Sequence, residues 1–161
     1  MPGETSAVAV LVVDLFQEIV AAASEESGLW GDAALSTRRR EPVAVFSTLA
    51  PERFALGLET IYEAYLVHYG RPRLFAPSEE SERVLLGDYL YAHGLVRVAE
   101  AGGVEAVAAM AELISRCAAL RAGGDDGEGD AWVDATRSRG GTPSGDEIAA
   151  ALVKHLARLA R

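Results

Sequence analysis

The sequence has one cysteine and few basic residues, and each shortage excludes a class of protein. Its single cysteine, Cys117, cannot form an internal disulfide, and no CxxC or HExxH spacing suggests a zinc site. The 15 Lys and Arg residues are outnumbered by 24 Asp and Glu residues, which gives a formal charge of -9. Such a surface would repel the phosphate backbone of nucleic acids. We therefore expect a protein of a reducing, cytoplasmic compartment without a nucleic-acid partner.

The sequence also lacks an uninterrupted hydrophobic run of membrane-spanning length. The N-terminal run Ala7–Val13 is apolar, but no basic leader precedes it, and Asp14, Gln17 and Glu18 interrupt it. A bilayer requires about 20 predominantly apolar residues. The run is therefore predicted to be neither a signal peptide nor a membrane span. The one basic run, Arg38–Arg40, is interpreted as a solvated loop rather than a phosphate-binding site.

Alanine, leucine and valine dominate what the sequence does contain. Half of its 161 residues are hydrophobic, and Ala and Leu are strong helix formers. A chain of this length matches one ordinary domain, which buries about two thirds of its unfolded surface. The composition therefore predicts a single all-α domain over residues 1–161, folded as a helical bundle.

Helical periodicity and the positions of glycine and proline divide the chain into predicted helices. These are expected at residues 5–26, 51–69, 80–101, 104–121 and 144–161. A polar connection is predicted over 31–42, and a flexible, acidic, glycine-rich loop over 122–143. The segment 82–101 is apolar on nearly all sides except at Asp88, His93 and Arg97. This pattern is typical of a helix at the centre of a bundle or in a subunit interface.

Several residues invite a chemical role, but none indicates a reaction. Asp125, Asp126 and Asp130 suit a hard cation such as magnesium, yet the glycines among them leave the carboxylates unorganised, and we favour a solvated loop. Cys117 lies in the middle of a predicted amphipathic helix, where a buried, inert thiol is expected. His155 lies beside the apolar stripe of the last helix and is predicted to be a partly exposed packing residue. No GxSxG turn presents a serine nucleophile.

Two helical segments carry a family resemblance. Residues 58–68 read LETIYEAYLVH, and residues 84–92 read VLLGDYLYA. The first resembles the helix before the first aspartate-rich motif of trans-polyprenyl diphosphate synthases, commonly L-E-x-I-H-x-A-S-L-I-H-D-D, and the second is similar to their AVLAGDYLLA helix. The positions that match the first pattern are Leu58, Glu59, Ile61, Ala64, Leu66 and His68. The resemblance covers residues 50–121 and implies a truncated isoprenoid-synthase-like bundle.

The chemistry of this family depends on aspartates that the sequence lacks. In the family, two DDxxD motifs hold magnesium ions that neutralise an allylic diphosphate as it leaves. With His68 aligned to the histidine before the first motif, Tyr69, Gly70 and Arg73 occupy the places of its three aspartates. None of them can replace an aspartate there, although Arg73 could contact a diphosphate directly, and the chain ends before the region of the second motif. The resemblance thus implies no metal and no cofactor in this chain, with magnesium in a catalytic partner.

The resemblance implies the short, noncatalytic subunit of a heteromeric hexaprenyl or heptaprenyl diphosphate synthase. Such a subunit supports the activity and product length of a full-length, DDxxD-containing partner that supplies quinone side chains. In the family, the GDYL helix forms the dimer interface, and the positions four and five before the first motif govern product length. The candidate interface and chain-length residues are Ala64, Tyr65, His68, Asp88, Tyr89, Tyr91 and His93.

Two other classes of function stay open. The chain could be a stand-alone helical module that binds an isoprenoid or another apolar ligand. It could also be a pseudoenzyme that self-associates through the same helices without prenyl chemistry. An intact prenyltransferase is the least favoured class, because it would need metal ligands that the sequence does not provide.

Overall fold

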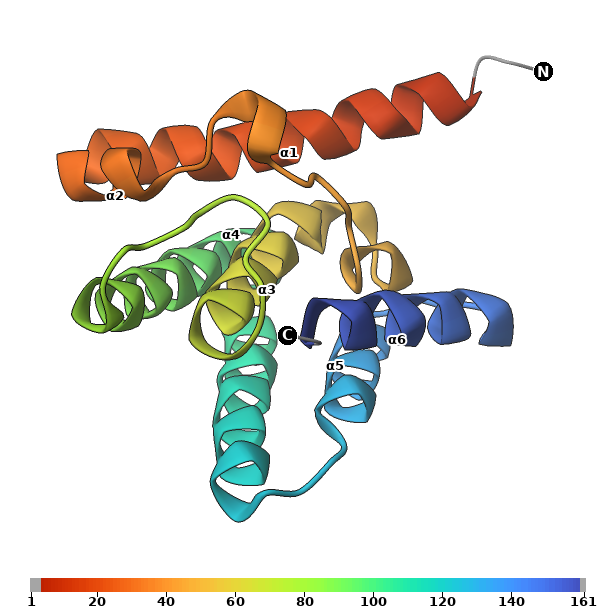
Figure 1. Cartoon of the computed structure of the whole chain (residues 1–161). Coiled ribbons are helices and arrows are strands. Elements are labelled where there is room, and N and C mark those ends of the chain that lie inside the picture. The colour runs from red at the N-terminus through yellow and green to blue at the C-terminus, as the bar shows by residue number, and fades with distance from the viewer. Residues whose placement is uncertain (1–3, 160–161) are drawn as a thin grey trace.

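The computed structural model describes residues 4–159, with side chains from residue 14 onward. Within this range the protein is all-α, as predicted. Its α-helices are α1 (Glu4–Glu26), α2 (Gly28–Ala33), α3 (Ala55–Tyr69), α4 (Glu80–Gly123), α5 (Glu128–Arg137) and α6 (Gly145–Leu159) (Figure 1). None of these helices is long and apolar enough to cross a bilayer. The side chains of the apolar run 7–13, and the last two residues of the predicted C-terminal helix, lie outside the described residues.

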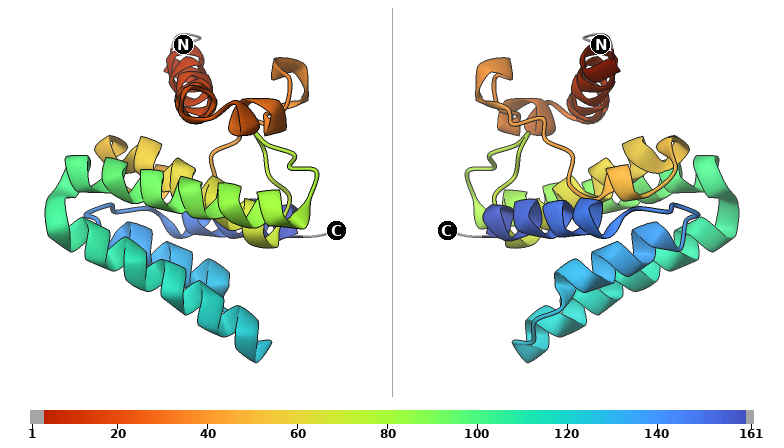
Figure 2. Two further views of the ribbon diagram at one scale, coloured as in Figure 1. Left: turned by 90° about the vertical axis from the view of Figure 1, so that its left-hand side faces the viewer. Right: turned by 90° about the vertical axis from the view of Figure 1, so that its right-hand side faces the viewer.

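The helices form three levels, with α3 in the middle level. Helices α1 and α2 lie on one side of this level, and the C-terminal half of α4 lies with α5 on the other (Figures 1 and 2). Within the middle level, α3 lies between the N-terminal half of α4 and α6. Two apolar clusters therefore meet at α3. One includes Phe16 and Leu86, and the other includes Phe46 and Trp132.

Helix α3 is the most deeply buried element. Every residue from Gly57 to Val67 is buried, including the polar residues Glu59, Thr60 and Glu63. The sequence predicts that residues 82–101 lie at the centre of a bundle or in a subunit interface. Within this chain the central position belongs to α3, while one side of the N-terminal half of α4 remains exposed.

The N-terminal half of α4 meets α3 at a close crossing. A Cβ atom built on Gly57 would lie 3.3 Å from the carbonyl oxygen of Gly94, and one built on Gly94 would lie 3.3 Å from the carbonyl oxygen of Gly57. The absence of a side chain at both positions lets the two backbones approach each other. The face of α4 that carries Leu86, Leu90 and Val98 is buried at this contact.

A sharp kink separates the two halves of α4. Gly103 has φ 70° and ψ -160°, which is non-helical, and a positive φ of this kind favours glycine. Figure 2 shows the two halves meeting at an angle, so that each half belongs to a different level. The predicted break at Gly102–Gly103 is therefore confirmed as a kink between two helical arms.

The segments between the helices differ from prediction at two places. The predicted flexible loop 122–143 is wrong for residues 128–137, which form α5 and bury Ala131, Trp132, Val133 and Thr136. The predicted connection 31–42 contains the end of α2 and a 3₁₀ turn, Thr37–Arg39. Two more 3₁₀ turns, Ser47–Leu49 and Glu52–Phe54, precede α3. The packing of Trp132 into the core stabilises α5 despite its acidic, glycine-rich surroundings.

Candidate functional site

The segment aligned with the first aspartate-rich motif is covered by the end of α6. Gly70 ends α3 by donating its N–H to the Leu66 carbonyl, and the N–H of Arg71 donates to the Arg158 carbonyl at 2.9 Å. The Arg158 guanidinium donates in turn to the Arg71 carbonyl and pairs with Glu41. A Cβ on Gly70 would lie 2.9 Å from the Arg158 carbonyl oxygen. Residues of α6 therefore occupy the space beside this segment.

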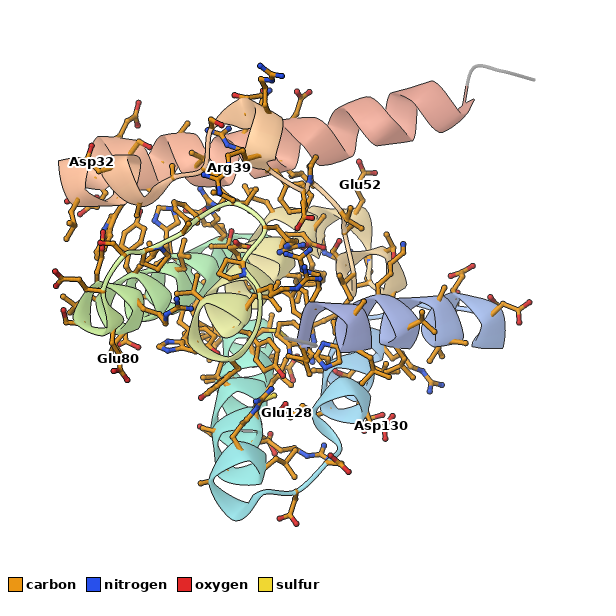
Figure 3. All side chains as sticks on the ribbon, viewed as in Figure 1. Asp32, Arg39, Glu52, Glu80, Glu128 and Asp130 are labelled. Atoms are coloured by element: carbon orange, nitrogen blue, oxygen red, sulfur yellow. The ribbon has the colours of Figure 1, made fainter. Side chains whose placement is uncertain are left out.

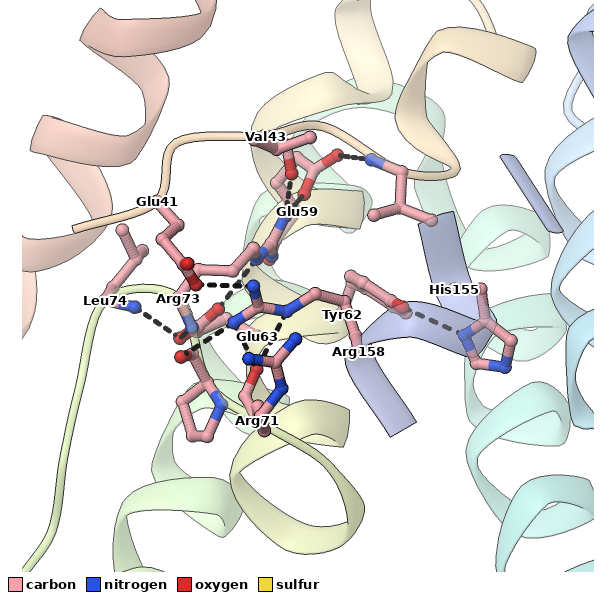
Figure 4. A network of polar contacts seen from close by, with 12 residues as sticks. Glu41, Val43, Glu59, Tyr62, Glu63, Arg71, Arg73, Leu74, His155 and Arg158 are labelled. Atoms are coloured by element: carbon pink, nitrogen blue, oxygen red, sulfur yellow. Dashed lines mark hydrogen bonds and ion pairs between the residues drawn. The ribbon is translucent and has the colours of Figure 1, made fainter. Parts of the chain in front are cut away.

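Arg73 lies at the centre of a buried polar cluster with Glu59 and Glu63 (Figure 4). Its Nη1 donates to Glu59 Oε2 at 2.6 Å and to the Val43 carbonyl at 2.8 Å, and its Nε donates to Glu63 Oε2 at 3.0 Å. The other oxygen of Glu63 accepts the backbone N–H groups of Arg73 and Leu74. We call these three side chains the Arg73 cluster. It ties α3 to the loop that follows it and to the segment that precedes it.

The Arg73 cluster fixes the fold and leaves no group for a ligand. The Arg73 side chain is fully buried, and its guanidinium lies 4.8 Å and 5.0 Å from the ring centroids of Phe16 and Tyr62. Burial alone would lower the pKa of Arg73, but the two carboxylates outweigh it and raise the pKa above its ordinary value. The expectation that Arg73 could contact a diphosphate is therefore wrong, because this charge is enclosed and already paired.

His68 and Tyr69 face α4 at the end of α3. The His68 ring stacks on Tyr91, with centroids 5.2 Å apart, and its Nε2 lies 3.3 Å from Asp88 Oδ1. Burial lowers the pKa of His68 despite the opposing effect of Asp88, so the ring is neutral at neutral pH. Tyr69 is half-buried, with the Arg121 guanidinium 5.0 Å from its ring centroid. Neither residue faces an open metal site.

Ala64 and Tyr65 are both inside the packed core. Ala64 belongs to the apolar cluster toward α1, and Tyr65 belongs to the cluster toward α5 and α6. The hydroxyl of Tyr65 donates to Glu128 Oε2 at 2.6 Å, and Glu128 also accepts from Arg121 Nε at 2.8 Å. Burial and the hydrogen bond to Glu128 raise the pKa of Tyr65. The two positions that the resemblance links to chain length thus hold the core together in this chain.

A second polar pair links α3 to α6. Tyr62 Oη lies 2.9 Å from His155 Nδ1, and both residues are buried. Burial lowers the pKa of His155 to about 4 and raises that of Tyr62, so both side chains are uncharged at neutral pH. The prediction that His155 is partly exposed is wrong, because its ring packs against Phe46 and Tyr65 and the residue is buried.

The thiol and the acidic loop carry no organised chemistry. Cys117 is buried as predicted, and burial raises the pKa of its thiol to about 12. Asp125, Asp126 and Asp130 are exposed. Among the side chains that the structure describes, no three His, Cys, Asp or Glu groups are arranged to hold a metal ion.

Most of the candidate interface residues on α4 make contacts within the chain. Tyr89 stacks on Trp30 at a centroid distance of 5.9 Å, and its hydroxyl lies 3.1 Å from His93 Nδ1. Tyr89, Tyr91 and His93 are half-buried. Asp88 differs from them, since its side chain is 67% exposed.

The exposed side of α4 is apolar and was not singled out from the sequence. Leu85 and Val96 are each 57% exposed, Val84 is 46% exposed, and Ala92 is also exposed between them. With Asp88 these residues form a stripe that we call the outer face of α4; Figure 2 (left) shows this helix in front of α3. The sequence does indicate an interface here, because residues 82–101 are apolar on nearly all sides. This pattern does not show which side of the helix packs within the chain and which side stays exposed.

Comparisons with protein-family models, with curated proteins and with solved structures found no significant match to this chain.

Proposed function

We propose that this chain is the noncatalytic small subunit of a heteromeric long-chain polyprenyl diphosphate synthase. In this role it binds a DDxxD-containing catalytic subunit through the outer face of α4 and supports the activity and product length of that subunit. Magnesium and the diphosphate substrate would be held by the partner. The proposal extends the resemblance of residues 50–121 to the observed surface of the chain.

The single observation that carries the proposal is the apolar outer face of α4. Monomeric proteins rarely expose a large contiguous apolar patch unless it contacts a partner. Here Leu85 and Val96 are more than half exposed, and they lie three helical turns apart on the same side of a helix. The same helix carries the GDYL motif, on which the resemblance depends.

A role without chemistry of its own is consistent with the motif segment. Tyr69 packs beside Arg121, Gly70 packs against α6, and Arg73 is enclosed by Glu59 and Glu63. A magnesium–diphosphate site needs several oxygen ligands directed at one open space. The side chains described around this segment supply no such arrangement.

Co-expression with a DDxxD-containing synthase from the same source tests the proposal. We expect a stable complex by size-exclusion chromatography, together with a gain in activity or longer products in a prenyl-transfer assay. The double variant Leu85→Lys/Val96→Lys should abolish both effects, because it places two charges in the apolar contact.

Val153→Lys is the matched control, since Val153 is 68% exposed on α6, away from the proposed interface. This variant should bind and activate the partner like the unmodified chain. A chain that remains monomeric and changes no synthase would refute the proposal. A stable homodimer that dissociates in the Leu85→Lys/Val96→Lys variant, without any effect on a synthase, would instead favour a self-associating pseudoenzyme.

A further inference from the structure

A second surface feature is independent of the outer face of α4. A groove of about 740 Å³ opens between α6 and the turn that leads into α5. It is lined by Arg121, the segment 124–130, Leu152, His155, Leu156 and Leu159. Its volume falls within the range of about 300–1,000 Å³ that is usual for small-molecule sites. We call it the His155 groove.

The floor of the groove contains a ring nitrogen that makes no hydrogen bond within the described residues. The His155 side chain is 2% exposed and uses Nδ1 to contact Tyr62. Its Nε2 has no hydrogen-bond partner among the described residues, and it lies 3.7 Å from the position of a Cβ built on Gly129. Figure 4 shows Tyr62 on one side of the ring, with the second nitrogen directed away from it. This nitrogen is not fully enclosed, so a molecule in the groove can reach it.

The hydrogen-bond network assigns the tautomer of His155. The Tyr62 hydroxyl is buried and has no other partner, so its proton is satisfied only if it donates to Nδ1. A neutral imidazole that accepts at Nδ1 carries its proton on Nε2. The groove therefore presents an N–H donor at its floor.

The walls of the groove restrict the rest of the ligand. Leu152, Leu156 and Leu159 form an apolar wall on α6, and Leu156 is 65% exposed. On the opposite side, Asp125 and Asp126 add negative charge near the opening. Asp130, labelled on α5 in Figure 3, also lines the groove, whereas Glu128 is paired with Arg121. An anion would be repelled, and an ammonium group would offer no acceptor to Nε2–H.

We propose that the His155 groove binds a neutral, apolar molecule with one oxygen acceptor, such as an aliphatic alcohol or ketone. Its oxygen accepts the hydrogen bond from His155 Nε2, and its hydrocarbon part lies along the leucine wall. The proposal does not depend on the proposed subunit function, since the groove lies on α5 and α6 and the outer face lies on α4.

Titration of the full chain with 1-octanol, followed by NMR of the His155 imidazole and the leucine methyl groups, tests the proposal. We expect saturable shifts at both, and weaker binding of octanoate, which has the same chain length but carries a negative charge. Gly129→Ala should weaken octanol binding about tenfold, because its Cβ would lie 2.9 Å from Leu152 Cδ2 and 3.2 Å from His155 Cδ2. Gly129 lies in a helix, and the nearest atom is the end of the flexible Leu152 side chain, so we expect the variant to fold.

Two further variants complete the test. His155→Phe keeps a ring but removes the donor, and should weaken binding about fivefold, the equivalent of one hydrogen bond. Val153→Ala lies outside the groove and should change the affinity by less than about twofold. Equal binding of octanol and octanoate, shifts that do not saturate, or full affinity in Gly129→Ala would each overturn the proposal.

Discussion

Helix α3 and the N-terminal half of α4 lie side by side, and their burial is the reverse of what their sequences favour. Helix α3 carries Glu59, Thr60 and Glu63 and is nonetheless buried on all sides. The N-terminal half of α4 is apolar around most of its circumference, yet it exposes Leu85 and Val96. The comparison teaches that neighbours, rather than composition, decide which helix becomes central.

The difference has a physical cause in what each helix contacts. A buried carboxylate is strongly destabilising unless it is paired and hydrogen-bonded. Glu59 and Glu63 satisfy this condition because Arg73 returns to them from the loop after α3. On α4, exposed apolar side chains lower stability little, and they leave a surface available to a partner. The following predictions test each side of the comparison.

The largest loss of stability is expected from Arg73→Met. This substitution leaves Glu59 and Glu63 buried without their counter-charge, which should lower the free energy of unfolding by about 3–5 kcal/mol in urea denaturation. Arg71→Met is the control, because Arg71 is exposed and its guanidinium donates a hydrogen bond to the Ala157 carbonyl rather than to a buried carboxylate. Equal stability of the two variants would contradict a central role for the Arg73 cluster.

The second largest change is expected in the pH dependence of stability, through His155 at the contact between α3 and α6. The pKa of His155 is lowered from 6.5 to about 4, so the unfolded state takes up a proton before the folded state does. The contribution of uncharged His155 to the free energy of unfolding is therefore complete above pH 6.5 and is lost as the pH falls toward 4. The loss amounts to about 3 kcal/mol.

Stability curves of the unmodified chain and of His155→Asn isolate this contribution. The amide oxygen of asparagine can still accept a hydrogen bond from Tyr62, but it does not titrate. The variant should therefore lose about 3 kcal/mol less than the unmodified chain between pH 7 and pH 4. Parallel curves for the two proteins would show that His155 does not titrate on unfolding.

A smaller effect is expected where α3 crosses α4. A Cβ on Gly94 would lie 2.5 Å from Ile61 Cγ1 and 3.1 Å from the Ile61 backbone nitrogen. Gly94→Ala should therefore lower the free energy of unfolding by about 1–3 kcal/mol through overpacking. Gly145→Ala is the matched control, since a Cβ on Gly145 would meet nothing within 4 Å. A Gly94→Ala variant as stable as this control would mean that the crossing can open without cost.

The smallest change in stability is expected on the outer face of α4. Leu85→Lys should change the free energy of unfolding by no more than about 0.5 kcal/mol, because the side chain is already largely in water. Leu90→Ala, on the buried face of the same helix, should instead lower it by about 2–5 kcal/mol. Similar losses in thermal or urea denaturation would show that the two faces are equally buried.

More of the fold than of the candidate sites could be predicted from the sequence. The periodicity of residues 5–26 and the glycine break at 102–103 depend on near neighbours in the sequence, and both predictions agree with the helices observed. Helix α5 was missed because acidic and glycine residues surround a short apolar pattern that includes Trp132. Its stabilising contacts come from distant positions, such as Phe46, whose ring stacks on Trp132 at 5.4 Å.

The sequence by itself determined the all-α class and the positions of most helix ends, because helical propensity, capping and periodicity act over a few residues. Only the tertiary structure decided that α3 is the central helix, that Arg73 is enclosed, and that His155 lies at the floor of a groove. These outcomes depend on contacts such as Tyr62 with His155, which lie 93 positions apart in the sequence. Local patterns carry no record of such partners, so the pairing is set only when the helices pack together.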